Sequence, residues 1–162
     1  LPGNHEFSYR RMGSPWYLVY RWSLIMPIYN PEKVTLSWGG VAARAVANGE
    51  MFNFTFNNDI WNTYASIKGG GAFVKSLDKT GTCVVSLQDV SPTKAAWQAL
   101  YEAGKPLPLI LIDRNSTGEV AGAKEAMLAR PPALVKAQEL TIVQFTFKFV
   151  DGYIIHTGQA LD

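Results

Sequence analysis

A strictly alternating apolar stretch near the end of the chain constrains the fold most. In residues 140–150, LTIVQFTFKFV, the side chains of Val143, Phe145, Phe147 and Phe149 recur at every second position, with mostly polar residues between them. Successive side chains of a β-strand point to opposite faces, so this period places the rings on one side. We therefore predict a long strand that lies on a core containing Phe145 and Phe147.

A second alternating segment, MFNFTFNN at residues 51–58, places Phe52, Phe54 and Phe56 on one face of a strand. Exposed aromatic residues of this kind could stack nucleic-acid bases, but such platforms also carry basic residues. Here the intervening residues are Asn and Thr. Core packing is therefore the favoured interpretation of the three phenylalanines.

Other short runs rich in strand-forming residues are separated by turn signals such as Asn-Gly and Asp-Gly. The alanine-rich run at 119–130 is ambiguous between helix and strand, and strand is favoured because its neighbours are strands and Pro131-Pro132 ends it abruptly. Asp151-Gly152 is predicted to be a turn. The further predicted strands are residues 33–38, 41–46, 80–87, 107–113, 119–130 and 153–156.

One helix is predicted at residues 92–103, PTKAAWQALYEA. Ser91 is a suitable N-cap, Pro92 suits the first helical position, and Gly104 comes just after the last turn. Trp97 and Leu100 fall on one side of this helix and are expected to pack on the sheet. The predicted fold is mainly β with one packed helix, an antiparallel sandwich or barrel whose closure could be shared between subunits.

Residues 57–72, NNDIWNTYASIKGGGA, are predicted to form a long excursion with a short strand inside it. The glycine run lacks the GxxxxGK[ST] pattern of a phosphate-binding loop, so a turn or hinge is favoured. Because this aromatic and glycine-rich segment resembles one that forms a contact between copies, we assign five residues to a subunit interface: Trp61, Tyr64, Gly69, Gly70 and Gly71.

The composition favours a protein that covers its surface by association. Hydrophobic residues make up 48% of the chain and charged residues only 17%, which is few for a solitary soluble domain. The formal net charge is +2, and residues 1–25 carry the whole excess. The rest of the chain is neutral, which argues against a basic nucleic-acid-binding face.

Residues that could support catalysis or metal binding are few and scattered. The chain has two histidines and a single cysteine, Cys83, which lies in an apolar alternating run and is expected to be buried. A trio of Ser86, Asp113 and His156 can be imagined, but no GxSxG motif surrounds the serine. We therefore predict no enzyme, no cofactor and no metal site. No apolar stretch reaches the length of a membrane-spanning helix, so no membrane anchoring is expected.

Residues 1–25 differ from the rest of the chain, since they lack a clear period and mix aromatic residues with arginines. At Met26 the sequence changes to MPIYNPEKVTLSW, which suits a natural start before a first strand. We interpret residues 1–25 as an extension, either an upstream addition or an arm that docks on a neighbour, and residues 26–162 as one domain. An intact mass of the native protein would separate these alternatives.

The stretch GGGAFVKSLDKTGTCVVSLQDVSPTKAAWQALYEAG, residues 69–104, resembles the family of phage tail tube proteins. In that family a strand of TGTVTVTL type leads into a Ser-Pro cap and a helix with a bulky central residue. Here residues 80–87, Ser91-Pro92 and Trp97 occupy those places. The resemblance extends over most of residues 30–150, and residues 1–25 match nothing in it.

The resemblance implies a tube subunit of a long-tailed phage, with a contractile tail favoured. It implies six-membered rings that stack around a channel for DNA, assembly in the host cytoplasm, and a place in the virion tail. The implied partners are copies of the chain together with sheath, baseplate and tape-measure proteins. Two alternatives remain: a related secretion-tube or tail-terminator ring protein, and a monomeric small-ligand-binding β-barrel.

Overall fold

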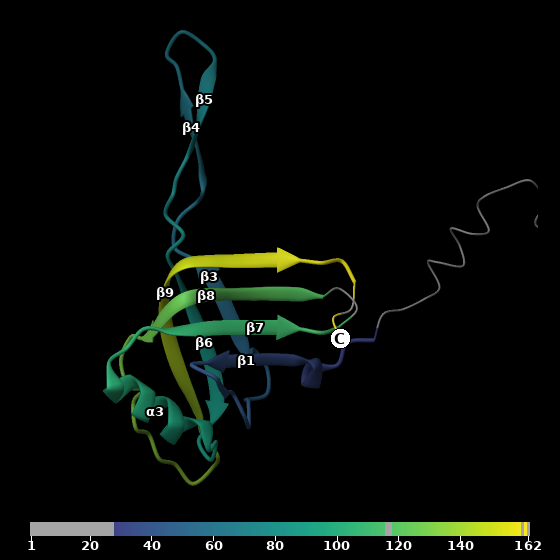
Figure 1. The fold of residues 1–162 in the computed structure, drawn as a ribbon, viewed down its shortest axis with the longest axis vertical. Helices are drawn as coiled ribbons and strands as arrows, with labels where there is room; N and C mark the ends of the chain where they lie inside the picture. Colours follow the sequence, from purple (N-terminus) through teal and green to yellow (C-terminus); the bar gives the residue numbers. More distant parts are fainter. Residues whose placement is uncertain (1–27, 116–117, 160, 162) are drawn as a thin grey trace, which may run out of the picture.

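The computed structural model describes residues 28–115, 118–159 and 161. Within them the chain forms a seven-stranded antiparallel sheet, a separate two-stranded hairpin, one α-helix and a short 3-10 helix (Figure 1). In chain order the elements are η1 (Pro31–Lys33), β1 (Val34–Trp38), β2 (Val41–Ala42), β3 (Phe52–Phe56), β4 (Trp61–Ala65), β5 (Gly71–Lys75), β6 (Gly81–Gln88), α3 (Thr93–Ala103), β7 (Leu107–Asp113), β8 (Glu119–Leu128) and β9 (Ile142–His156).

The large sheet is open and curls over its own core. Its strand order is β2-β1-β7-β8-β9-β6-β3, so β2 and β3 are its two edges. The long strand β9 bends and belongs to both layers, since its first half pairs with β6 and its second half with β8 (Figure 1). The prediction of a mainly β, antiparallel sandwich with one packed helix is confirmed, but the sheet does not close into a barrel within one chain.

The core lies between the two layers and is strongly aromatic. Phe145, Phe147 and Phe149 are buried, as the alternation of β9 predicts. In the core, the ring centroids of Phe147 and Trp38 lie 5.0 Å apart. Phe54 of the opposite edge stacks on Phe149 with centroids 4.4 Å apart. Because these rings come from β1, β3 and β9, they hold the two layers together.

The helix covers one end of this core. Trp97 is wholly buried and sets its indole edge-on to Phe145 and Phe147. The N-cap position is Pro92 rather than the predicted Ser91, and Ser91 Oγ, one residue earlier, accepts a hydrogen bond from the Thr93 amide at 3.3 Å. At the other end Gly104 adopts a left-handed conformation, with φ of 70°, as predicted from its position. Leu100 packs against the core and is partly buried.

Two strand predictions need correction, and the first concerns the end of β9. Asp151-Gly152 does not turn the chain, and the predicted strand at 153–156 continues β9 without interruption. Asp151 takes a positive φ of 54°, which bends the strand instead. A Cβ on Gly152 would lie 2.2 Å from the Phe149 ring, so the ring occupies the space that glycine leaves.

The second correction concerns residues 41–46, of which only β2, Val41–Ala42, is a strand. The backbone leaves β1 after Ala42, takes a positive φ of 51° at Ala45, and then forms an isolated bridge to β6 between Val46 and Leu87. The backbone polar groups of Arg44 are satisfied by side chains at the start of α3. The Arg44 amide donates to Thr93 Oγ1 at 3.0 Å, and Ser91 Oγ donates to the Arg44 carbonyl at 2.5 Å.

The predicted strands at 80–87, 107–113 and 119–130 are confirmed as β6, β7 and β8. Residues 1–25 and the proposed start at Met26 lie outside the described residues. In the part of the chain that is described, no helix is long and apolar enough to cross a membrane.

Candidate assembly surfaces

A two-stranded hairpin, β4–β5, projects from the body of the molecule (Figure 1). Neither strand pairs with the large sheet, and all ten of their residues are exposed. An isolated two-stranded hairpin is at best marginally stable in water. This hairpin is therefore expected to gain stability from a surface that covers it.

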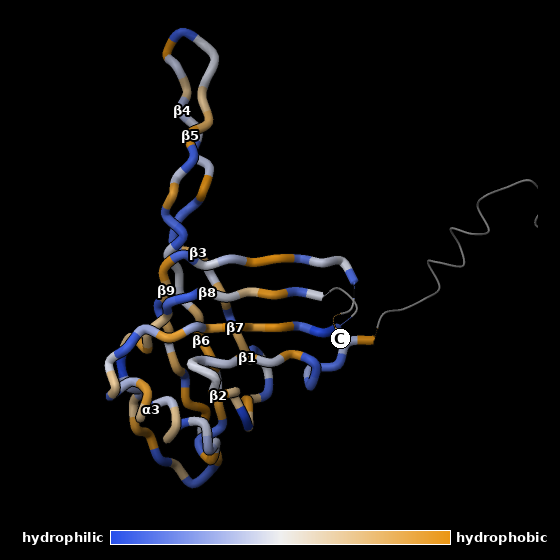
Figure 2. Tube along the Cα trace, in the orientation of Figure 1, coloured by the Kyte–Doolittle hydropathy of each residue, from blue (hydrophilic) through white to orange (hydrophobic). Residues whose placement is uncertain are grey.

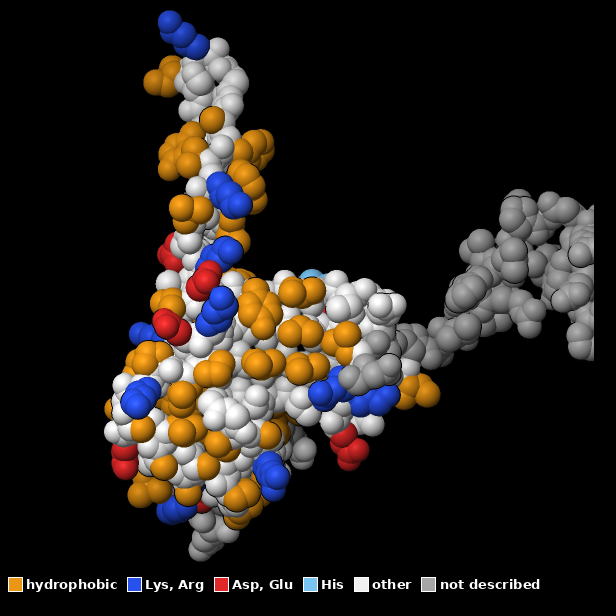
Figure 3. Space-filling view, in the orientation of Figure 1, with side chains coloured by type: hydrophobic (Ala, Val, Ile, Leu, Met, Phe, Trp, Pro, Cys, Tyr) orange, Lys and Arg blue, Asp and Glu red, His pale blue; other side chains and the backbone are white. Residues whose placement is uncertain are grey.

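The hairpin carries bulky apolar side chains on both faces. Trp61 and Phe73 belong to one face and Tyr64 and Val74 to the other, as the strand register dictates. Trp61 is 59% exposed and Phe73 75%. Lys75 lies over the Trp61 ring, with Nζ 5.8 Å from its centroid. Figure 3 shows these hydrophobic side chains along the projection, with basic side chains at its tip and along its length.

The glycine run forms the turn of the hairpin, as predicted. Gly69 and Gly70 have φ values of 91° and 80°, which other residues rarely adopt. Gly71 begins β5, and a Cβ there would lie 2.9 Å from the Tyr64 carbonyl oxygen. The five residues assigned to an interface therefore lie together on one projection, but the contact with another copy remains a prediction.

A second apolar surface covers the outer face of β7, β8 and β9. Figure 2 shows hydrophobic stretches side by side on these three strands. Ile110, Gly122 and Tyr153 lie opposite one another in the ladder and so share one face. The next row on that face is formed by Ile112, Val120 and Ile155. Ile110, Tyr153 and Ile155 are exposed, so the sheet presents apolar rows to solvent.

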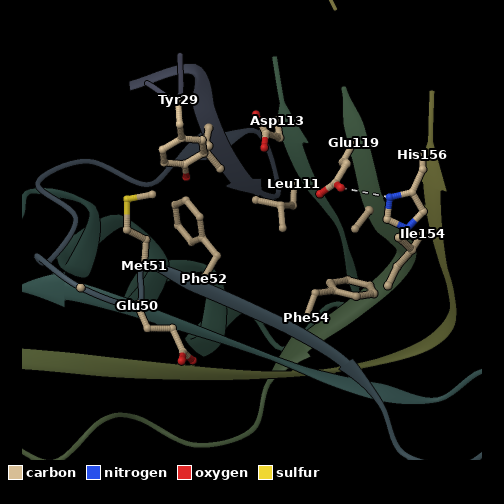
Figure 4. Close-up of a pocket in the computed structure, with 13 residues that line it drawn as sticks. Tyr29, Glu50, Met51, Phe52, Phe54, Leu111, Asp113, Glu119, Ile154 and His156 are labelled. Atoms are coloured by element: carbon tan, nitrogen blue, oxygen red, sulfur yellow. Dashed lines mark hydrogen bonds and ion pairs between the residues drawn. The ribbon is translucent and has the colours of Figure 1, made fainter. Parts of the chain in front are cut away.

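A cavity of about 470 Å³ opens at the end of the sheet opposite α3. The side chains of Phe52, Phe54, Leu111 and Ile154 point into it (Figure 4). Its other lining residues are Tyr29, Val34, Gly49, Glu50, Met51, Asp113, Glu119, Ala121 and His156. The floor is thus built from the same two layers that form the core, at the end away from the helix.

Carboxylates give this cavity a negative rim. Oε1 of Glu119 lies 3.1 Å from Nδ1 of His156, within hydrogen-bonding distance. Asp113 Oδ1 accepts from both the backbone amide and the side-chain amide of Asn115, at 2.8 and 2.7 Å. No lysine or arginine is among the described residues that line the cavity. An apolar ligand that carries a positive charge would suit this arrangement.

The titratable and nucleophilic side chains of the described residues do not come together in a reactive centre. Asp113 and His156 line the cavity, but Ser86 of the imagined trio does not. No group of three or more His, Cys, Asp or Glu side chains there could hold a metal. Cys83 is buried, and its burial raises the pKa of the thiol to about 12. Such a thiol is unreactive at neutral pH.

The residues predicted to form the core lie where expected. Phe145, Phe147 and Trp97 are fully buried, while Leu100 and the three phenylalanines of β3 are partly buried against the core. Sequence reasoning missed both the outer apolar face and the cavity. The alternation of β9 assigned its buried face, but the bend at Asp151 changes which residues face inward beyond it. No local pattern signals that change.

No protein-family model matches the sequence, and no curated protein matches it. The fold does have counterparts among solved structures. A sheath/tube terminator of an extracellular contractile injection system (PVC), in its extended state, aligns with a TM-score of 0.55 and 10% identity over 82% of this chain and 99% of that chain. The tube-terminating cap of the anti-feeding prophage (AFP) aligns with a TM-score of 0.51 and 10% identity over 82% and 94%.

A chain of the PVC sheath–tube complex, also in the extended state, aligns with a TM-score of 0.51 and 8% identity over 85% of this chain and 93% of that chain. These alignments span almost the whole of each counterpart. At such low identity they establish a common fold. The chain therefore has the fold found in tube-terminator and sheath–tube components of contractile injection systems.

Proposed function

We propose that this protein is a structural, ring-forming subunit at the end of a contractile tail tube, in the role of a tube terminator. The observation that carries the proposal is the fold, which two terminator chains share over 94% and 99% of their lengths. A tube subunit is the second candidate, because a chain of a sheath–tube complex shares the fold as well. Neither role requires catalysis or a cofactor.

The unpartnered surfaces support self-association. The hairpin and its tip expose five large apolar side chains, and the outer face of β7–β9 exposes more. Soluble monomers rarely leave extended apolar patches uncovered. The edge strand β3 also has no neighbouring strand on its outer side among the described residues, so a neighbouring subunit could pair with its backbone. The β2 edge is instead covered by α3, whose Trp97 and Thr93 donate hydrogen bonds to the Val41 and Ala42 carbonyls.

One face of the sheet suits the wall of a channel. On the outer side of β3, β6 and β9, Asn53, Val84 and Thr146 lie in one row and Thr55, Thr82 and Lys148 in the next. Four of these side chains are neutral and polar. A wall of this kind would be wetted without holding a polyanion strongly, and Lys148 is its exception. We assign this face to the channel through which DNA passes.

The proposed setting rests on the same reasoning. Copies of the chain form the ring, most simply a hexamer, and the ring contacts sheath and tube proteins, with baseplate and tape-measure proteins elsewhere in the same particle. The particle is a phage virion tail assembled in the cytoplasm of the bacterial host. Two of the three counterparts belong to injection systems rather than to phages by name, so a tail-like injection particle is the alternative setting.

Light scattering after size exclusion, with negative-stain microscopy over a concentration series, tests the proposal. A terminator is expected to form single rings that do not grow with concentration. A tube subunit would instead stack into tubes of indefinite length. A monodisperse monomer at high concentration, under conditions where both assemblies are stable, would contradict both roles and favour a solitary ligand-binding protein.

A further inference from the structure

The tip of the hairpin presents an apolar and a basic side chain next to each other. Ile67 is completely exposed, and Lys68 comes directly after it. The turn is ordered by hydrogen bonds from the Ser66 amide to the Gly70 carbonyl, at 3.0 Å, and from the Gly69 amide to the Ser66 carbonyl, at 3.2 Å. The tip therefore has a defined turn conformation.

The charge of the whole projection has one sign. Between Asp59 and Asp78, at the base of the hairpin, the only charged residues are Lys68 and Lys75. Asp78 is held at the base by Asn58, whose side-chain amide donates to Asp78 Oδ2 at 2.7 Å. The exposed part thus combines aromatic and aliphatic side chains with positive charge and carries no acidic residue.

The cavity offers the complementary features. Its floor is formed by Phe52, Phe54 and Leu111, and the carboxylates of Asp113 and Glu119 lie beside it (Figure 4). The Glu119 side chain is 47% exposed. Among the described residues its one side-chain partner is His156, which contacts Oε1. Its second oxygen can therefore accept a hydrogen bond from an incoming ammonium group.

We propose that the Ile67–Lys68 tip of one copy inserts into the cavity of a second copy, with Ile67 on the aromatic floor and Lys68 at Glu119. The inference rests on the self-association proposed above and names the two surfaces that meet. The cavity, about 470 Å³, is larger than one isoleucine side chain. The basic tip and the acidic rim attract each other, which favours this pairing over contact between two hairpins.

The geometry makes this contact head-to-tail. The hairpin points away from the sheet, so its tip cannot reach the cavity of its own chain (Figure 1). Donor and acceptor are different surfaces, and each copy therefore both gives a tip and receives one. Repetition of such a contact produces a closed ring or a stack, depending on the rotation between neighbours.

Cross-linking of two singly substituted full-length chains tests the pairing. Ile67→Cys and Glu119→Cys are purified separately, mixed, oxidised and separated on a non-reducing gel. The native Cys83 is wholly buried and does not interfere. The expected result is a disulfide-linked dimer of the mixture. Leu134→Cys replaces Glu119→Cys in the control, since Leu134 is 82% exposed but does not line the cavity.

The outcomes separate this inference from the proposed function. A dimer with Glu119→Cys and none with Leu134→Cys supports the inference. Rings that form without that cross-link, or an Ile67→Cys chain that links only to itself, would overturn the inference and leave the proposed function intact. Absence of any oligomer in the unsubstituted protein would overturn both.

Charge reversal supplies a second readout. Lys68→Glu and Glu119→Lys are each expected to weaken association about tenfold or more, because like charges then face each other. The chain that carries both substitutions restores opposite charges and is expected to recover most of the association. Two single losses that simply add in the double variant would refute a direct contact between Lys68 and Glu119.

The alternative occupant of the cavity is the N-terminal segment, which carries Arg10, Arg11 and Arg21. A chain that begins at Met26 distinguishes the two. With the hairpin as occupant, the cross-link forms equally in the full and the shortened chain. A cross-link that appears only after residues 1–25 are removed would assign the cavity to that segment and overturn the inference.

Discussion

Replacement of Trp97 by alanine tests the central packing of the fold. The indole is fully buried and meets Phe145 and Phe147 edge-on, with centroid distances of 5.3 and 5.1 Å. Its Nε1 donates a hydrogen bond to the Val41 carbonyl at 3.2 Å, which ties α3 to β2. The substitution removes all of these contacts and leaves a cavity at the end of the core that the helix covers.

The expected loss of unfolding free energy is about 3–5 kcal/mol, as for other large-to-small changes in a core. Within that total, each aromatic pair contributes about 0.5–1.5 kcal/mol. The hydrogen bond to Val41 contributes about 1 kcal/mol. The remainder is the burial of the ring and the cavity it leaves.

Urea unfolding followed by far-ultraviolet circular dichroism measures the change, with the slope of the transition checked for constancy. Trp61→Ala is the matched control, measured at a protein concentration too low for association, because that side chain is 59% exposed on the hairpin. The control is expected to change stability by less than about 0.5 kcal/mol. A loss below about 1 kcal/mol for Trp97→Ala would refute its place as the central packing residue.

Three further predictions concern the hairpin, the cysteine and an ion-pair cluster. Phe73→Ser is expected to reduce ring formation seen by light scattering, while Leu134→Ser, at a comparably exposed site, leaves it unchanged; equal effects would remove the hairpin from the interface. Cys83, whose pKa burial raises to about 12, should react with a maleimide at pH 7 only after unfolding, and fast labelling of the native protein would contradict its burial. Hydrogen bonds from Lys136 and Lys94 hold the pKa of Asp89 below its ordinary value. The ionised carboxylate therefore stabilises the fold at pH values above the ordinary pKa, and this stabilisation is lost as the pH falls through the lowered pKa. Asp89→Asn should therefore lower the melting temperature at pH 7 and have a shrinking effect in increasingly acidic buffer; a constant difference would exclude the ionised carboxylate as the cause.

Local signals in the sequence were enough to define several elements of the fold. The alternation at 140–150 and at 51–58 identified β9 and β3 and their buried faces, because period 2 depends only on strand geometry. Gly104 marked the end of α3 for a comparable reason, since a left-handed residue is needed there. The glycine run likewise indicated the turn that Gly69 and Gly70 form, whereas contact of this segment with another copy stays a prediction.

The way in which these elements meet depends on long-range packing. Strand β9 continues through Asp151 because its second half pairs with β8. This pairing extends as far as His156, which lies opposite Glu119. The pairing also brings Asp113, Glu119 and His156 from three strands to one cavity. Such neighbours are distant in sequence and carry no shared pattern. Strand order and register place them together, and both are set by the packing of the whole core rather than by any one segment.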